Sequence, residues 1–262
     1  SLLSQEYSRT GREFGLFLEY KAGNSTFAIV PQVSVTSGDG RNSFGVDSRD
    51  SDLGGFKYSG RLDVYPFGFF SPGNDKSIAD LQHEQTIKMV LGGAASFNDG
   101  ASQAVGEGHG DFVLYNTNGV LNQPDYRQVY GDIVVKYQGF SLLGEYGVAT
   151  ATKLEGTYIT PTGTDALLPT EISEFVALGT GYNVQLGYVS KEGYALDLRY
   201  AGADPEFSEN AASVIQQQEG YTIGLSEYFK GNALKIQAAF LQFTYADGSD
   251  MMLGQLLFQV IF

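Results

Sequence analysis

The chain has 262 residues, a formal net charge of −14 and no cysteine, so disulfide bridges and thiolate metal sites are excluded. The acidic balance also argues against nucleic acid as a partner, because phosphate backbones are bound by clustered Lys and Arg. The chain is rich in Gly, Tyr and Phe, and no apolar run reaches the roughly 18 residues that a membrane-spanning helix needs.

Apolar and polar residues alternate from the N-terminus onward, and this period of two predicts β-strands. In residues 12–21, Leu16 and Leu18 fall on one face. The next predicted strand, 26–36, contains Pro31, which has no N–H to donate, so we expect a bulge or a local break there. The predicted strands are 12–21, 26–36, 55–66, 85–97, 128–137, 140–150, 175–189, 193–201, 219–229, 233–245 and 251–262.

The last predicted strand, 251–262, has one wholly apolar face and one mixed face. Phe262, Val260 and Phe258 belong to the apolar set, whereas Gln259 belongs to the mixed set. Such a strand needs a neighbour at its edge, and in a membrane the first strand supplies it by closing the sheet. The alternative is the final strand of a soluble sandwich, whose apolar faces pack in a common dry centre.

The connections between these strands alternate in length. The short ones are 22–25, 138–139, 190–192 and 230–232, and the long ones are 37–54, 98–127, 151–174 and 202–218. Only 66–83 and 247–250 break the alternation. Short turns on one side and long loops on the other are typical of outer-membrane barrels. We therefore predict an all-β fold, a transmembrane antiparallel up-and-down β-barrel of about 11–12 strands, in which residues 1–262 form a single domain.

Strand parity predicts that the chain is incomplete at its N-terminus. Bacterial barrels have an even number of strands and both ends on the periplasmic side. An odd count of about eleven would instead start the chain on the outer side. Either residues 1–11 contain a further strand or preceding strands are absent, and we expect the latter.

Five segments carry a family resemblance: Gly60-Arg61-Leu62-Asp63-Val64-Tyr65-Pro66-Phe67-Gly68, the hairpin 132–146, and residues 221–226, 231–237 and 258–262. Together they resemble the porin O/P family, the phosphate-selective porins, as found in Bacteroidetes-type bacteria. The resemblance implies a passive, usually trimeric channel of about sixteen strands, of which roughly the first five would be missing here. The family's phosphate selectivity does not follow, because the sequence has neither the ladder of Arg nor the cluster of Lys that it uses.

Charged residues on the mixed faces are the candidate pore lining. A Lys or Arg on the lipid side would cost about 2–4 kcal/mol near the midplane, so we expect these side chains to face water. Basic and acidic groups could form a transverse field, or they could simply pair across strands. The candidates are Lys57, Arg61, Asp63, Lys88, Asp132, Lys136, Glu145, Asp197, Arg199 and Lys235. Loop 98–127 is the expected constriction, folded inward toward Arg61, Lys88, Lys136 and Arg199.

Aromatic residues near the strand ends predict two interfacial girdles. They are Tyr20, Tyr58, Phe97, Tyr137, Phe140, Tyr146, Tyr188, Tyr194, Tyr200, Tyr221 and Phe262. Acidic residues concentrate in the long loops, and we interpret them as solvated surface. The alternative is a rim that holds divalent cations between anionic lipid head groups.

The predicted function is that of an outer-membrane porin, which passes small hydrophilic solutes, anions such as phosphate among them, by passive diffusion. Its expected partners are outer-membrane lipids, lipopolysaccharide and these polar solutes, and it would act as a homotrimer or within an outer-membrane assembly. No cofactor or metal is expected. The alternative is a plugged barrel that serves as a structural or partner-binding subunit of a larger outer-membrane complex. We do not expect an enzyme, because His109 beside Glu107 and Asp111 is more typical of a solvated loop than of a catalytic site.

Overall fold

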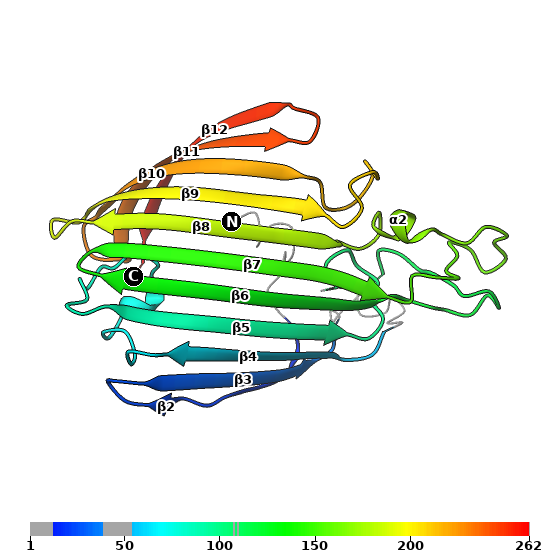
Figure 1. Cartoon of the computed structure of the whole chain (residues 1–262), viewed down its shortest axis with the longest axis horizontal. Helices are drawn as coiled ribbons and strands as arrows, with labels where there is room; N and C mark the ends of the chain where they lie inside the picture. Colours follow the sequence, from blue (N-terminus) through cyan, green and yellow to red (C-terminus); the bar gives the residue numbers. More distant parts are fainter. Residues whose placement is uncertain (1–12, 39–53, 107, 109, 262) are drawn as a thin grey trace.

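The computed structural model describes residues 13–38, 54–106, 108 and 110–261. They form one antiparallel sheet of 12 strands whose order along the sheet follows the chain (Figure 1). The strands are β1 (Gly15–Glu19), β2 (Ala22–Gly23), β3 (Ala28–Thr36), β4 (Lys57–Tyr65), β5 (Lys88–Asn98), β6 (Asp125–Tyr137), β7 (Phe140–Thr152), β8 (Gly179–Val189), β9 (Tyr194–Pro205), β10 (Gln218–Tyr228), β11 (Leu234–Tyr245) and β12 (Asp250–Val260). The predicted all-β, antiparallel, up-and-down fold is confirmed.

Each predicted strand has a counterpart in the sheet. The first, 12–21, corresponds to β1, and pairing resumes after a break opposite Pro31 in β2, whose residues were predicted to belong to the turn 22–25. The Tyr20 N–H donates to the Pro31 carbonyl at 3.1 Å, but Pro31 has no N–H to return. The ladder therefore breaks at Tyr20 and Lys21, and β1 and β2 pair with β3 on either side of the break. Because both pairings keep the same register, the predicted local break is present without a bulge.

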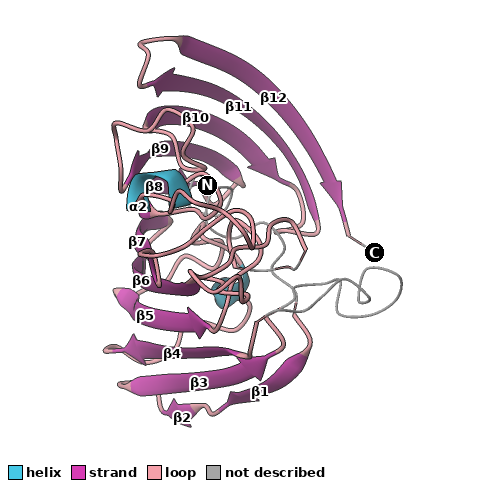
Figure 2. Ribbon diagram, turned by 90° about the vertical axis from the view of Figure 1, so that its right-hand side faces the viewer, coloured by secondary structure: helices cyan, strands magenta, loops and turns pink. Residues whose placement is uncertain are grey.

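The sheet curves around a concave side but does not close within the described residues (Figure 2). Its two edges are β1 and β12, and β12 is exposed along almost its whole length. The expected closure of the last strand onto the first is therefore wrong for this part of the chain. Each pair of neighbouring strands turns the sheet by a limited angle, and these strands together do not complete a circle. The further strand considered for residues 1–11 lies outside the described residues.

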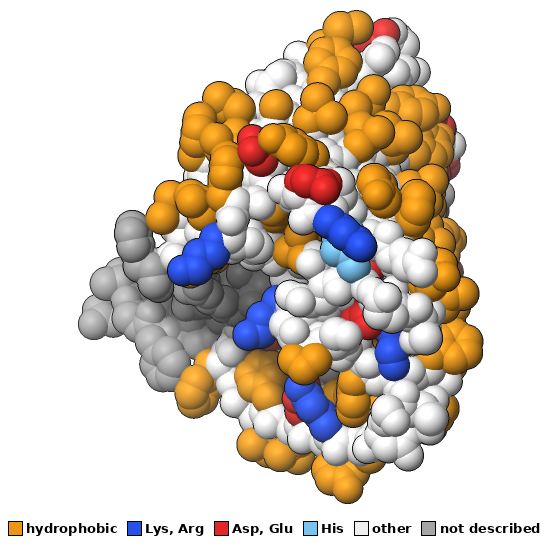
Figure 3. Space-filling model, turned by 90° about the vertical axis from the view of Figure 1, so that its left-hand side faces the viewer, with side chains coloured by type: hydrophobic (Ala, Val, Ile, Leu, Met, Phe, Trp, Pro, Cys, Tyr) orange, Lys and Arg blue, Asp and Glu red, His pale blue; other side chains and the backbone are white. Residues whose placement is uncertain are grey.

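The convex and concave faces differ because side chains alternate along each strand. Large apolar residues stand exposed on the convex face: Leu16 is 62% exposed, Tyr58 49%, Leu91 43% and Phe258 65%. The soluble-sandwich alternative is therefore wrong, since it needs these four in one dry centre. Figure 3 shows the molecule from one end, where charged side chains gather in the middle and hydrophobic ones lie along the convex margin.

Tight turns lie at one end of the sheet and long loops at the other (Figure 1). The connection between β4 and β5, residues 66–87, is the long exception at the short-turn end and contains η3 (Asn74–Lys76). The long-loop end carries α2 (Pro169–Ile172), and no helix in the described part of the chain is long and apolar enough to cross a membrane.

The buried apolar core sits on the concave side at the long-loop end. There the loops 99–124, 153–178 and 206–217 pack against one another and against the inner wall of the sheet. The cluster comprises Ala101, Val105, Tyr126, Ala149, Ile172, Val176, Ala177, Leu178, Ala203 and Ile215.

Candidate functional site

The strand register places all ten candidate residues on the concave face. Directly paired residues of neighbouring strands lie on the same face, and one such row runs from Asp63 through Gly92 and Asp132 to Glu145. The same alternation and pairing place the rest: Lys57, Arg61, Lys88, Lys136, Asp197, Arg199 and Lys235. The structure thus gathers residues that span β4 to β11 on a single surface.

Arg61 is the centre of the first cluster on this surface. Its guanidinium donates two hydrogen bonds to the Asp132 carboxylate, at 2.7 and 2.9 Å, and lies 2.7 Å from Asp63 Oδ1. Gln32 Nε2 donates to the other oxygen of Asp63 at 3.4 Å. Two carboxylates therefore share one cation, and the cluster keeps a formal charge of −1.

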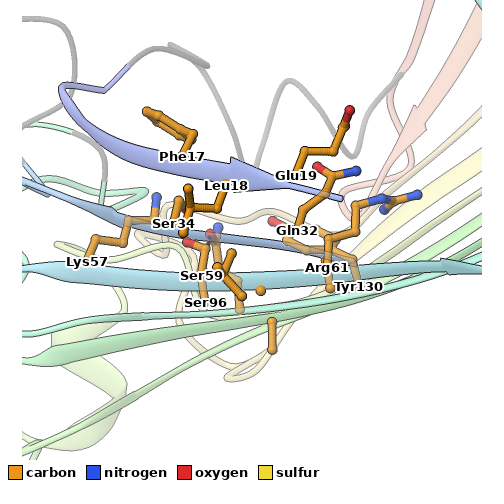
Figure 4. Close-up of a pocket in the computed structure, with 15 residues that line it drawn as sticks. Phe17, Leu18, Glu19, Gln32, Ser34, Lys57, Ser59, Arg61, Ser96 and Tyr130 are labelled. Atoms are coloured by element: carbon orange, nitrogen blue, oxygen red, sulfur yellow. Dashed lines mark hydrogen bonds between the residues drawn. The ribbon is translucent and has the colours of Figure 1, made fainter. Parts of the chain in front are cut away.

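A hollow of about 460 Å³ lies beside this cluster (Figure 4). Hydroxyl and amide groups from β3, β4, β5 and β6 line its concave wall, and Lys57 joins them with its ammonium group 3.0 Å from Glu13 Oε1. The labelled lining residues are Phe17, Leu18, Glu19, Gln32, Ser34, Lys57, Ser59, Arg61, Ser96 and Tyr130.

A second hollow of about 520 Å³ lies over β8 to β12. Gln185 bridges its charged groups: its Oε1 accepts from Arg199 at 2.7 and 3.1 Å, and its Nε2 donates to Asp197 at 3.1 Å. Beside it, Asn183 Nδ2 donates to Glu145 Oε2 at 2.7 Å. In the first cluster the charges form ion pairs, which favours pairing over a transverse field there, whereas in the second the Gln185 amide stands between Arg199 and Asp197.

The amides of this surface were missed in the sequence, although a signal for them was present. Gln185, Gln237 and Gln255 all line the second hollow. Gln237 has the parity of Lys235 on its strand, and Gln255 belongs to the mixed face of the last predicted strand, so alternation could have selected these two amides as well. Among the described residues no cluster of His, Asp and Glu is suited to hold a metal ion.

Two of the basic candidates are held by the connection at the short-turn end. Lys136 is 1% exposed, and its ammonium group donates to the carbonyls of Asn74, Ser77 and Ala79. Lys88 Nζ donates to the Phe67 carbonyl at 2.6 Å. The segment 66–87 therefore reaches onto the concave face, where it buries Lys136 and holds the half-buried Lys88.

Loop 98–127 was expected to fold inward toward these basic residues as the constriction, and its role as a constriction stays a prediction. Val105 belongs to the apolar cluster at the long-loop end, and Phe112 packs on it with its ring 5.4 Å from that of Phe175. The loop folds inward, but its apolar side chains find their partners in loops 153–178 and 206–217. His109 and Glu107 lie outside the described residues.

Aromatic side chains form two rows on the convex face. In β7, β8 and β9 the members of the two rows are spaced six residues apart, which is roughly 20 Å along a strand. The short-turn row contains Phe140, Tyr188 and Tyr194, and the other contains Tyr146, Tyr182 and Tyr200, followed by Tyr221 on β10. Aliphatic residues such as Leu186, Leu196 and Ile223 fill the band between them.

Comparison with known proteins gives a likeness to solved structures alone. No protein-family model and no curated protein sequence matches the chain. Among solved structures, the chain is similar to Pseudomonas aeruginosa OccK8 (OprE), with a TM-score of 0.42 and 16% sequence identity. The match covers 95% of this chain and 71% of that chain.

Proposed function

We propose that the protein is an outer-membrane channel through which small hydrophilic solutes diffuse passively. The observation that carries this proposal is the contrast between an exposed apolar convex face and a concave face of charges, amides and hydroxyls. Soluble monomers rarely expose apolar patches larger than a few hundred Å². The convex face instead suits lipid, and its two aromatic rows suit the two interfaces of a bilayer.

The ten charged candidates are proposed to line the water-filled interior. Because Arg61 is held by two carboxylates, it adds no free cation to the lining, and the single net negative charge of this cluster should give only weak discrimination between ions. Arg199 and Lys235 form no ion pair with a described carboxylate, and Lys235 Nζ lies 5.7 Å from the centre of the Tyr228 ring. These two cations support passage of anions, phosphate among them, through the part of the channel bounded by β9 to β11.

The open edges of the sheet support association with further polypeptide in the membrane. An unpaired strand edge in lipid leaves its backbone N–H and C=O groups unsatisfied, at a cost of several kcal/mol each. Among the described residues, β1 and β12 both have such an edge. We propose that the protein works as a homotrimer or within a larger assembly, with lipopolysaccharide and other outer-membrane lipids against the convex face.

Bilayer recording of the purified full chain tests the channel proposal. Discrete open steps with weak ion preference are expected, together with liposome swelling that slows as the sugar solute grows. Heat-unfolded protein at the same concentration is the control. Folded protein that gives neither conductance nor swelling would refute the channel.

A structural subunit is the second candidate, and one observation favours it. Loops from one end and residues 66–87 from the other both occupy the concave side of the sheet. If they seal the interior, the barrel would serve as a scaffold in an outer-membrane complex. Folded protein that is silent in bilayers and leaves membranes together with stable partners would support this function.

A further inference from the structure

Residues 66–87 differ from every other described connection at the short-turn end. The others, 24–27, 138–139, 190–193 and 229–233, are tight turns that cannot reach into the interior. Residues 66–87 instead fold into a compact body that lies on the concave side (Figure 2). We call this segment the end plug.

The end plug is fastened to the wall of the sheet at several points. Lys136 on β6 lies under it, donating to three of its carbonyls, and its ammonium group lies 5.0 Å from the centre of the Phe70 ring. The Gly139 N–H donates to Asp80 Oδ2 at 2.8 Å, and the Gln138 N–H donates to the Glu84 carbonyl at 2.9 Å. The plug is thus joined to both β6 and the β6–β7 turn.

A buried polar network holds the end plug in shape. Asn74 Nδ2 donates to Asp80 Oδ1 and to Glu84 Oε1, both at 2.8 Å. The Ser71 N–H and hydroxyl donate to the two oxygens of Glu84 at 2.7 and 2.8 Å. Asp80 is 0% exposed and Glu84 3%, so these charges depend on the network rather than on water. Buried charges of this kind are tolerated only when their partners stay in place, which makes the plug a rigid body.

The end plug also reaches the far side of the concave space. Asn232 lies in the β10–β11 turn, and its Nδ2 donates to the Lys76 carbonyl at 3.5 Å. The Asn232 carbonyl in turn accepts from Gln259 on β12. The plug therefore extends from β6 to the turn between β10 and β11, across strands that lie between them in the sheet.

We propose that the end plug is a fixed filter, an inference that rests on the proposed channel function. It narrows the channel opening at the short-turn end and limits the size of the solutes that pass. Lys136 is its fastening residue. Short turns lie on the periplasmic side of outer-membrane barrels, so the filter would act at the periplasmic mouth. A fixed filter of this kind restricts solutes by size, whereas the charges of the open wall act on ion preference.

Two variants of the full chain test the filter in bilayers and liposomes. One replaces residues 67–86 by a short Gly-Ser turn, and the other is Lys136→Met, which keeps the side-chain length but removes the charge. The control is Lys235→Met, which removes a cation from the same face with no contact to the plug. The shortened variant should at least about double the single-channel conductance and speed swelling in a trisaccharide relative to arabinose. Lys136→Met should move both quantities the same way by less. Lys235→Met, at a proposed pore-lining residue, should alter ion preference but leave the ratio of trisaccharide to arabinose swelling rates unchanged.

Crosslinking supplies a readout that does not depend on conduction. The chain has no cysteine, so Lys76→Cys with Asn232→Cys can be joined by a short bismaleimide in the folded, membrane-inserted protein. Lys76→Cys with Ser249→Cys, in the β11–β12 turn at the opposite end of the sheet, is the matched pair. We expect crosslinking in the first pair and much less in the second. Equal or absent crosslinking in both would overturn the crossing position of the plug.

The outcomes separate this inference from the channel proposal. If the parent protein conducts and the shortened variant keeps its conductance and solute-size limit, the filter is refuted while the channel stands. If the parent is silent and the shortened variant conducts, the plug is the barrier. If both are folded and silent, the channel proposal fails and the filter fails with it.

Discussion

Arg61 on β4 and Asp132 on β6 are joined across the intervening strand β5 by hydrogen bonds of 2.7 and 2.9 Å. The pair passes over Gly92, where an added Cβ would lie 2.3 Å from Arg61 Nη2 and 2.5 Å from the Asp132 carboxylate oxygens. Because glycine has no side chain, Gly92 on β5 leaves room for Arg61 on β4 and Asp132 on β6 to meet on the concave face. This arrangement ties non-adjacent strands together and fixes the charge of the first cluster.

Replacing Gly92 by Ala should break this contact. The new methyl group would force the guanidinium and the carboxylate apart, and overpacking of this kind typically costs about 1–3 kcal/mol in the free energy of unfolding. Gly93→Ala is the matched control, because Gly93 is the next residue, faces the other side and has open space around its Cβ position. Urea unfolding of the refolded protein measures both. A Gly92→Ala loss no larger than that of Gly93→Ala would contradict the described pairing.

Removing the Arg61 charge should shift the channel toward cations. Arg61→Gln leaves Asp63 and Asp132 without their shared cation, so the local negative charge rises and attracts cations into the interior. Asp132→Asn should shift the preference in the opposite direction. The measurement is the reversal potential in a KCl gradient, and values that move together in both variants would be inconsistent with Arg61 and Asp132 lining the conducting path.

A lysine should be far more costly on the convex face than on the concave one. Ile223, 50% exposed, and Thr222 are neighbours on β10 that point to opposite sides. Ile223→Lys would place a charge in lipid and should cost about 2–4 kcal/mol near the midplane. Thr222→Lys faces the proposed interior and should cost less than about 1 kcal/mol. Unfolding free energies in lipid vesicles compare the two, and equal costs would argue against a lipid-facing convex surface.

Tyr126 should hold the long-loop cluster together. Its hydroxyl donates to the Ala177 carbonyl at 2.7 Å, and both residues are buried in the cluster. Tyr126→Phe leaves that carbonyl unsatisfied at a cost of about 1–3 kcal/mol, so loops 99–124 and 153–178 should open more often. Faster cleavage of these loops by protease is the expected result. Tyr182→Phe removes a hydroxyl from the convex face instead and should leave the cleavage rate unchanged.

The alternation of apolar and polar residues was sufficient to predict the strands and their inner faces. It misplaced strand boundaries where neighbouring loop residues are also apolar and buried. The strand predicted from residue 175 begins at Gly179, because Val176, Ala177 and Leu178 are buried in the loop cluster and not in the sheet. A short apolar run in the sequence has the same appearance whether it is buried in a strand or in a loop. The strand predicted from residue 128 begins at Asp125, whose polar side chain resembles a loop residue but accepts from Lys153 at 2.8 Å.

The partners of the site residues could not be predicted from the sequence. Lys136 and Lys88 have the right parity for the concave face, yet their hydrogen-bond partners are carbonyls in residues 66–87. Backbone carbonyls leave no signature in a sequence. Only the unusual length of this connection at the short-turn end hinted at a separate role. The position of Arg61 on the concave face was predictable from alternation. Its pairing with Asp132, two strands away, was not, because it depends on the absence of a side chain at Gly92.

Labelling of single cysteines in lipid vesicles tests the orientation of the sheet most directly. Ala239 lines the second hollow, and its neighbour Phe240, 49% exposed, lies on the convex face of β11. We predict that Ala239→Cys reacts with a water-soluble maleimide, whereas Phe240→Cys resists it and, once labelled in detergent with a fluorophore, is quenched by brominated lipid. Equal reactivity at the two positions, or quenching at Ala239→Cys instead, would contradict a lipid-facing convex surface around a watery interior.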